Sequence, residues 1–134
     1  MSKHVGSKSL RSQPFQQAAT DYHPDAFLFV RMGLSKTMRR LGKNRTEVRD
    51  RHVTGQELAR GLRDIAQRRY GLLALTVLNR WNIHSTLDFG RIVYALIDAG
   101  LLSKSQEDTL NDFADVYDFR KTFTEPRMSK KAKA

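Results

Sequence analysis

The stretch that decides the fold begins at residue 52 with HVTGQEL and ends at residue 102 with DAGLL. It places Thr54 three residues before Glu57, directly ahead of an apolar run. Such a pair satisfies two backbone amides at a helix start, because the threonine oxygen accepts from the third helical amide and the glutamate reaches back. Ser85 and Asp88 repeat this spacing, and Gly100 stands where a helix would end. The stretch therefore predicts three helices, over about residues 55–69, 72–80 and 86–99.

Two further helices flank this stretch. Pro24 suits a first helical position, where its missing amide hydrogen costs nothing, and apolar residues then recur at helical spacing up to Gly42. Residues 107–118 show the same apolar spacing with acidic charges only. We therefore predict a mainly α fold, a compact five-helix domain, which leaves space for a small β-hairpin near residues 48–53 and 117–123. The short third helix should bury one apolar stripe, formed by Leu72, Leu75, Leu78 and Trp81.

A winged-helix fold is the alternative that the sequence keeps open. Residues 96–102 have the form Leu-x-x-x-Gly-Leu-Leu, which is typical of the exit from a recognition helix into a β-wing. A helix that reads bases needs donors and acceptors on its exposed face. Here that face would offer one basic residue, Arg91, beside the acidic residues Asp88 and Asp98. The pattern therefore favours an ordinary helical core with a glycine stop.

Composition excludes several classes of site. The chain has no cysteine, which excludes disulfides, cysteine nucleophiles and thiolate zinc sites. No histidine pair has the spacing of a metal site, and no Gly-rich phosphate loop or Gly-x-Ser-x-Gly elbow occurs. His52 beside Glu57 is the one acid/base candidate, although helix capping already explains Glu57. We expect a non-enzymatic, cytoplasmic protein with no catalytic residue, no cofactor, no metal and no membrane partner.

The net charge of +10 is unevenly distributed. Residues 52–119 hold slightly more acids than bases, whereas the excess of bases lies in residues 1–19, 31–51 and 120–134. We interpret residues 1–19 and 124–134 as flexible basic tails on a single helical domain over residues 20–123. Basic tails favour polyanions through counterion release, without sequence preference.

The basic segment at residues 36–51 is the candidate nucleic-acid site. Its cations would follow a phosphate backbone, so we expect weak, salt-dependent binding of RNA before DNA. The residues predicted to carry it are Lys36, Arg39, Arg40, Lys43, Arg45, Arg49 and Arg51. Two alternatives remain: the acidic residues of segment 107–118 could pack against these cations, or the cations could form a solvated face.

A protein partner is the alternative function. Helical spacing places Leu87, Arg91 and Tyr94 on the outward face of the fourth helix, and a small apolar and aromatic patch of this kind suits a protein contact. The acidic fifth helix is a second surface, which would dock on a basic partner. Binding that survives high salt would favour this adaptor function.

Several short motifs resemble a small protein family of planctomycete and verrucomicrobial bacteria. They lie in order between about residues 20 and 123: YHPDAF at 22–27, HVTGQEL at 52–58, Trp81, DFG at 88–90 and YDF at 117–119. Asn82 and Arg91 depart from the pattern, in which a glycine follows the tryptophan and an acid follows DFG. The resemblance implies a bacterial protein. The family has no assigned activity, so the resemblance implies a role for no residue.

Overall fold

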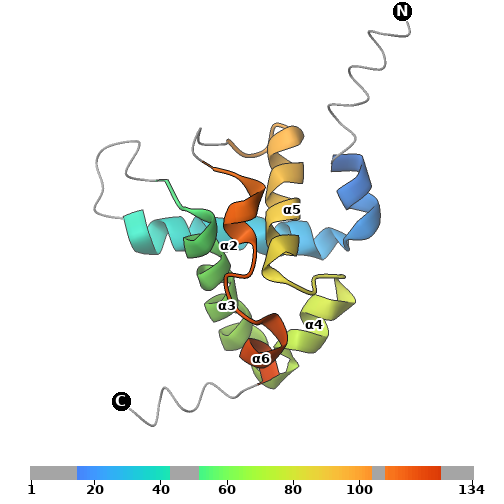
Figure 1. The fold of residues 1–134 in the computed structure, drawn as a ribbon, viewed down its shortest axis with the longest axis vertical. Coiled ribbons are helices and arrows are strands. Elements are labelled where there is room, and N and C mark those ends of the chain that lie inside the picture. The colour runs from blue at the N-terminus through green and yellow to red at the C-terminus, as the bar shows by residue number, and fades with distance from the viewer. Residues whose placement is uncertain (1–14, 43–51, 104–107, 125–134) are drawn as a thin grey trace, which may run out of the picture.

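A computed structural model describes residues 15–42, 52–103 and 108–124 of the chain (Figure 1). These residues form helices and short 3-10 turns, which confirms the mainly α fold. A helix over residues 15–21 comes first. The elements that follow are α2 (Pro24–Gly42), α3 (Gly55–Tyr70), η2 (Gly71–Leu73), α4 (Ala74–Arg80), α5 (Thr86–Asp98), η3 (Leu110–Phe113) and α6 (Phe119–Thr124).

Capping residues set the helix starts as the sequence predicted. The Thr54 hydroxyl accepts from the Glu57 amide at 3.1 Å, and the Glu57 carboxylate accepts from the Thr54 amide at 3.0 Å. At the start of α5, Asp88 Oδ2 accepts from the Ser85 amide at 3.2 Å. The backbone amides in the first turn of a helix have no carbonyl partner within the helix, and these capping side chains accept their hydrogen bonds instead.

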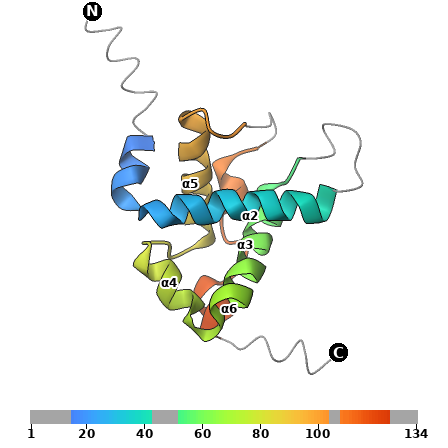
Figure 2. The ribbon, with the colours of Figure 1, turned by 180° about the vertical axis from the view of Figure 1, so that it is seen from behind.

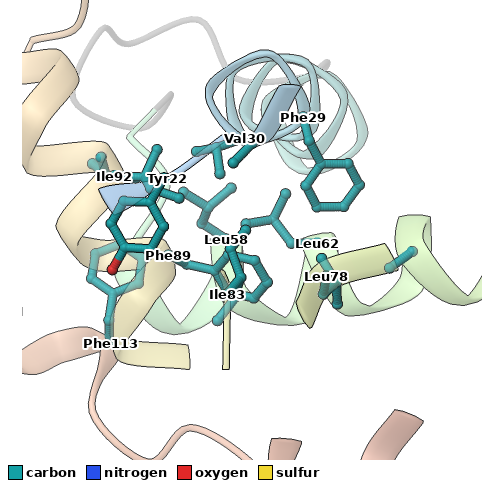
Figure 3. Close-up of a cluster of buried hydrophobic side chains, with 14 of the residues drawn as sticks. Tyr22, Phe29, Val30, Leu58, Leu62, Leu78, Ile83, Phe89, Ile92 and Phe113 are labelled. Carbon is teal, nitrogen blue, oxygen red and sulfur yellow. The ribbon is translucent and has the colours of Figure 1, made fainter. Parts of the chain in front are cut away.

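One hydrophobic core fills the space between α2, α3, α4 and α5. Figure 3 shows Val30 from α2, Leu62 from α3, Leu78 from α4 and Phe89 from α5 pointing toward one another. Each of these four side chains is fully buried. Burial of a side chain of this size contributes roughly 1.5–3 kcal/mol, so the four helices stabilise one another through this shared core.

Two glycines allow α2 and α3 to cross at close range (Figure 2). A Cβ on Gly33 would lie 2.1 Å from Leu62 Cδ2, and a Cβ on Gly61 would lie 2.1 Å from Thr37 Oγ1. Glycine inside a helix costs about 0.5–1 kcal/mol relative to alanine. The crossing therefore depends on having no side chain at these two positions.

The Asp88 carboxylate connects the start of α2 to the start of α5. Asp88 is buried. Its carboxylate accepts hydrogen bonds from the Tyr22 hydroxyl, from the His84 amide at 2.8 Å and from the Ser85 amide. Arg91 Nη1 lies 3.4 Å from Oδ1, the oxygen that also accepts from Tyr22. A buried carboxylate is tolerated when its oxygens are bonded in this way.

The prediction of a fifth helix over residues 107–118 is wrong. Residues 104–107 lie outside the described part, and only Leu110–Phe113 is helical, as the 3-10 turn η3. Ala114 is extended and Asp115 has φ 50°. The reason is tertiary: the Phe113 ring packs on Gly90, and the Phe113 carbonyl accepts from Thr86 Oγ1 at 2.6 Å.

Three other expectations also change. The β-hairpin predicted near residues 48–53 and 117–123 does not form in the described part of these segments. Residues 52–54 are irregular, and residues 119–124 form α6. Leu72 is 74% exposed, because Gly71 ends α3 with φ 54° and α4 begins only at residue 74. The helix over residues 15–21 packs on the core through Ala18, so the folded part begins before residue 20.

Gly61→Ala tests the helix crossing. We expect a loss of about 1–3 kcal/mol in unfolding free energy, because the new methyl group meets Thr37. Thr37→Ala in the same chain should recover part of the loss. It removes the Thr37 hydroxyl, which has no hydrogen-bond partner in the described structure. Urea unfolding measures both changes, with the exposed Ser35→Ala as a control. Equal stability of Gly61→Ala and the wild type would contradict the close crossing.

Alkaline pH tests the Tyr22 contact. Burial, followed by the hydrogen bond to Asp88, raises the pKa of Tyr22. The unfolded chain therefore loses this phenolic proton first, and stability that is present below about pH 10 falls above it. Tyr22→Phe should cost about 1–3 kcal/mol at neutral pH and make the alkaline fall shallower. Urea unfolding from about pH 8 to about pH 11 checks both effects. Parallel curves for the two proteins would refute the assignment.

Candidate nucleic-acid interface

The cations of the last turns of α2 are accessible. Lys36, Arg39 and Arg40 are all exposed, and the single acid of α2, Asp25, lies in its first turn. Cations near a helix C-terminus also interact favourably with the carbonyl end of the helix. The second half of α2 is therefore a positive surface whose charge suits the helix itself.

Asp64 of α3 partly offsets this charge. Its Oδ2 lies 3.7 Å from Arg40 Nη1, and its Oδ1 accepts from Arg63 Nε at 2.9 Å. The Arg40 side chain remains 54% exposed, and ion pairs of this kind stabilise by only about 0–1 kcal/mol. Within the described ranges, no ion pair involves Lys36 or Arg39. Two cations of the predicted site are thus available for a ligand, and a third is partly engaged.

The other four residues of the predicted site follow α2 in the sequence. They are Lys43, Arg45, Arg49 and Arg51, and all four lie outside the described residues. The same holds for the bases of residues 1–14 and 125–134. The structure therefore places the helical part of the predicted basic segment and leaves its continuation unplaced.

A groove beside the start of α2 was not predicted from the sequence. It has a volume of about 410 Å³, and Asp25, Leu28 and Met32 of α2 form one wall. Tyr70 and Trp81 also line it, with their ring centroids 6.1 Å apart. Trp81 was predicted as a core residue, and it is indeed half-buried against the core. Helical spacing alone could not show that it also faces a groove.

The predicted partner face on α5 is not an exposed patch. Leu87 and Tyr94 are half-buried and pack against the core, which corrects the outward orientation expected for them. Arg91 is exposed, with its guanidinium held near Asp88. The reason is that η3 packs on α5, a contact that helical spacing within α5 does not reveal.

Three acidic residues of segment 108–118 make contacts within the fold. Asp112 accepts from the Thr109 amide at 3.0 Å, and Asp118 accepts from the Lys121 amide at 2.9 Å. Asp108 Oδ1 lies 2.9 Å from His52 Nε2. Asp112 and Asp118 thus cap turns and Asp108 pairs with a histidine, whereas η3 packs against α5 and α3.

His52, Asp108 and Tyr94 surround a small cavity of about 90 Å³. Burial, followed by the nearby Asp108 and Asp112 carboxylates, raises the pKa of Tyr94. Glu57 is occupied by the capping bonds to Thr54, so the acid/base pair considered from the sequence does not form. The cavity is smaller than ligand pockets usually are.

The described residues offer neither a metal site nor a membrane span. No group of three or more histidine, aspartate or glutamate side chains is arranged to hold a metal ion. No helix in the same ranges is long and apolar enough to cross a membrane.

No known family model matches the chain, and no curated protein or solved structure is significantly similar to it. The resemblance to the planctomycete and verrucomicrobial family therefore stays a prediction.

Proposed function

We propose that the protein is a non-enzymatic module that binds the backbone of nucleic acids, RNA before DNA, through α2 and its basic flanking segments. The observation that carries the proposal is the exposure of Lys36, Arg39 and Arg40 in the last turns of one helix. Lys36 and Arg40 are one turn apart, about 6 Å along the axis. Cations in such a row neutralise phosphates and release counterions.

We propose RNA before DNA because α5 lacks the side chains that reading bases in the major groove requires. A helix that reads the major groove needs free donors and acceptors on its exposed face. On α5 the basic residue of that face is Arg91, and its guanidinium lies against the Asp88 carboxylate. Backbone contact without base reading in the major groove suits RNA and single strands. The proposal implies a protein of the cytoplasm, where RNA is abundant.

Charge reversal on α2 tests this function. Lys36→Glu with Arg39→Glu should weaken binding of labelled single-stranded RNA about tenfold and flatten its salt dependence, because two phosphate contacts are lost. Fluorescence anisotropy from about 50 to 200 mM salt measures both effects. Arg120→Glu with Lys121→Glu is a matched control, since both residues are exposed on α6 and the charge change is the same. Equal weakening by the two pairs would reject α2 as the site.

Asp64→Asn should strengthen RNA binding by about two- to fivefold and steepen its salt dependence. The substitution removes the carboxylate that lies 3.7 Å from Arg40, which frees this cation for phosphate. The gain should vanish in an Arg40→Gln background, measured by the same anisotropy titration. A gain of equal size with and without Arg40 would show that Asp64 acts through overall charge alone.

A further inference from the structure

The groove at the start of α2 has the composition of a site for a flat aromatic ligand. Tyr70 and Trp81 are half-buried and form part of its wall, and Trp81 is the only tryptophan of the chain. Leu28, which is 63% exposed, and Met32 also line the groove. A leucine of this exposure beside a groove with two aromatic side chains is a surface that a ligand would cover.

We propose that this groove binds one unpaired nucleobase of a single-stranded nucleic acid. This inference rests on the backbone-binding function proposed above and names its ligand class more closely. Bases in single strands are recognised by stacking on aromatic side chains and guanidinium planes, whereas bases in a duplex are stacked on one another. A volume of about 410 Å³ lies within the usual range for a small ligand.

The chemistry of the walls fits a base. The tyrosine and tryptophan rings and the Met32 thioether offer polarisable, apolar contacts to a π face. Arg69 also lines the groove, and its Nη1 lies 2.9 Å from Met32 Sδ. The guanidinium therefore lies beside Met32 in the lining, where it can stack on the base or contact its phosphate.

The groove continues into the cation row of α2. Residues 28, 32, 36 and 39 follow one another at spacings of four, four and three, so they share one face of the helix. Lys36 lies about 6 Å and Arg39 about 10 Å beyond Met32 along the helix axis. A strand with its base in the groove would therefore extend its phosphates toward Lys36 and Arg39.

Asp25 gives the groove a direction. Asp25 lines the groove at the N-terminal end of α2, away from Lys36 and Arg39, and its side chain is 58% exposed, with Oδ2 3.8 Å from His23 Nδ1. A carboxylate repels phosphate but accepts hydrogen bonds from the amino groups of adenine, cytosine and guanine. We infer that the amino edge of the base points toward Asp25 and the backbone toward Lys36. Uracil, which lacks an amino group, should bind less well.

The test uses the full chain and labelled oligonucleotides of about eight nucleotides: oligo-A, oligo-C, oligo-U and an abasic oligomer with the same phosphates. We expect oligo-A and oligo-C to bind about tenfold more tightly than the abasic oligomer, with oligo-U between them. Trp81 fluorescence should be quenched by the oligomers with bases and unchanged by the abasic one. Leu28→Gln and Met32→Gln should remove the preference for bases and leave binding of the abasic oligomer unchanged. Leu72→Gln, a neutral change at another exposed leucine, is the control.

The two proposals fail in different ways. Equal binding of all four oligomers without quenching of Trp81 would overturn the base site and leave backbone binding intact. Absence of binding by every oligomer at low salt would overturn both, and the apolar groove would then belong to a protein partner. Asp25→Ala separates direction from stacking, since it removes the acceptor and should reduce the preference over oligo-U while quenching by oligo-A persists. An unchanged preference would remove Asp25 from the site.

Discussion

The arrangement of the helices depends on how the Asp88 carboxylate is held. Its bonds to the Tyr22 hydroxyl and to the His84 and Ser85 amides join two places that are 66 residues apart in the sequence. Removal of one partner from a buried charge is costly, so this contact has little freedom to change. Asn82 strengthens the same junction, because its side chain donates to the Asp21 carbonyl at 2.8 Å. The start of α2 is thereby fixed above the loop between α4 and α5, which is the geometry that the groove requires.

The glycine crossing supplies the second fixed point of α2. Gly33 against Leu62 and Gly61 against Thr37 bring α2 so close to α3 that one face of α2 is fully used for packing. Since both ends of the contact are fixed, the helix has no freedom to rotate about its axis. The face with Leu28 and Lys36 must therefore stay outward, with Met32 half-buried between them. Exposure of Leu28 and Lys36 is a consequence of packing on the opposite side.

Short-range signals in the sequence predicted the parts of the fold that short-range bonds decide. The capping pairs at Thr54 and Ser85 and the proline at the start of α2 gave correct helix starts. The prediction for residues 107–118 was wrong because contacts of Phe113 with Gly90 and Gly55 outweigh a weak acidic helix pattern. The exposed cations of α2 could be found from helical spacing. The groove could not, because its lining comes from α2, the end of α3 and Trp81 after α4, and no spacing within one helix shows that these segments meet.

The charges of α2 lie where the helix itself favours them. Functional cations placed side by side usually destabilise a protein through mutual repulsion. Here Asp25 lies at the amide end of α2, and Arg39 and Arg40 lie at its carbonyl end. Each position is favourable to the helix by about 0.3–1 kcal/mol, and Asp64 reduces the repulsion further. The direction that the proposed site requires, acid at the base end and cations along the phosphates, is therefore also the direction that stabilises the helix.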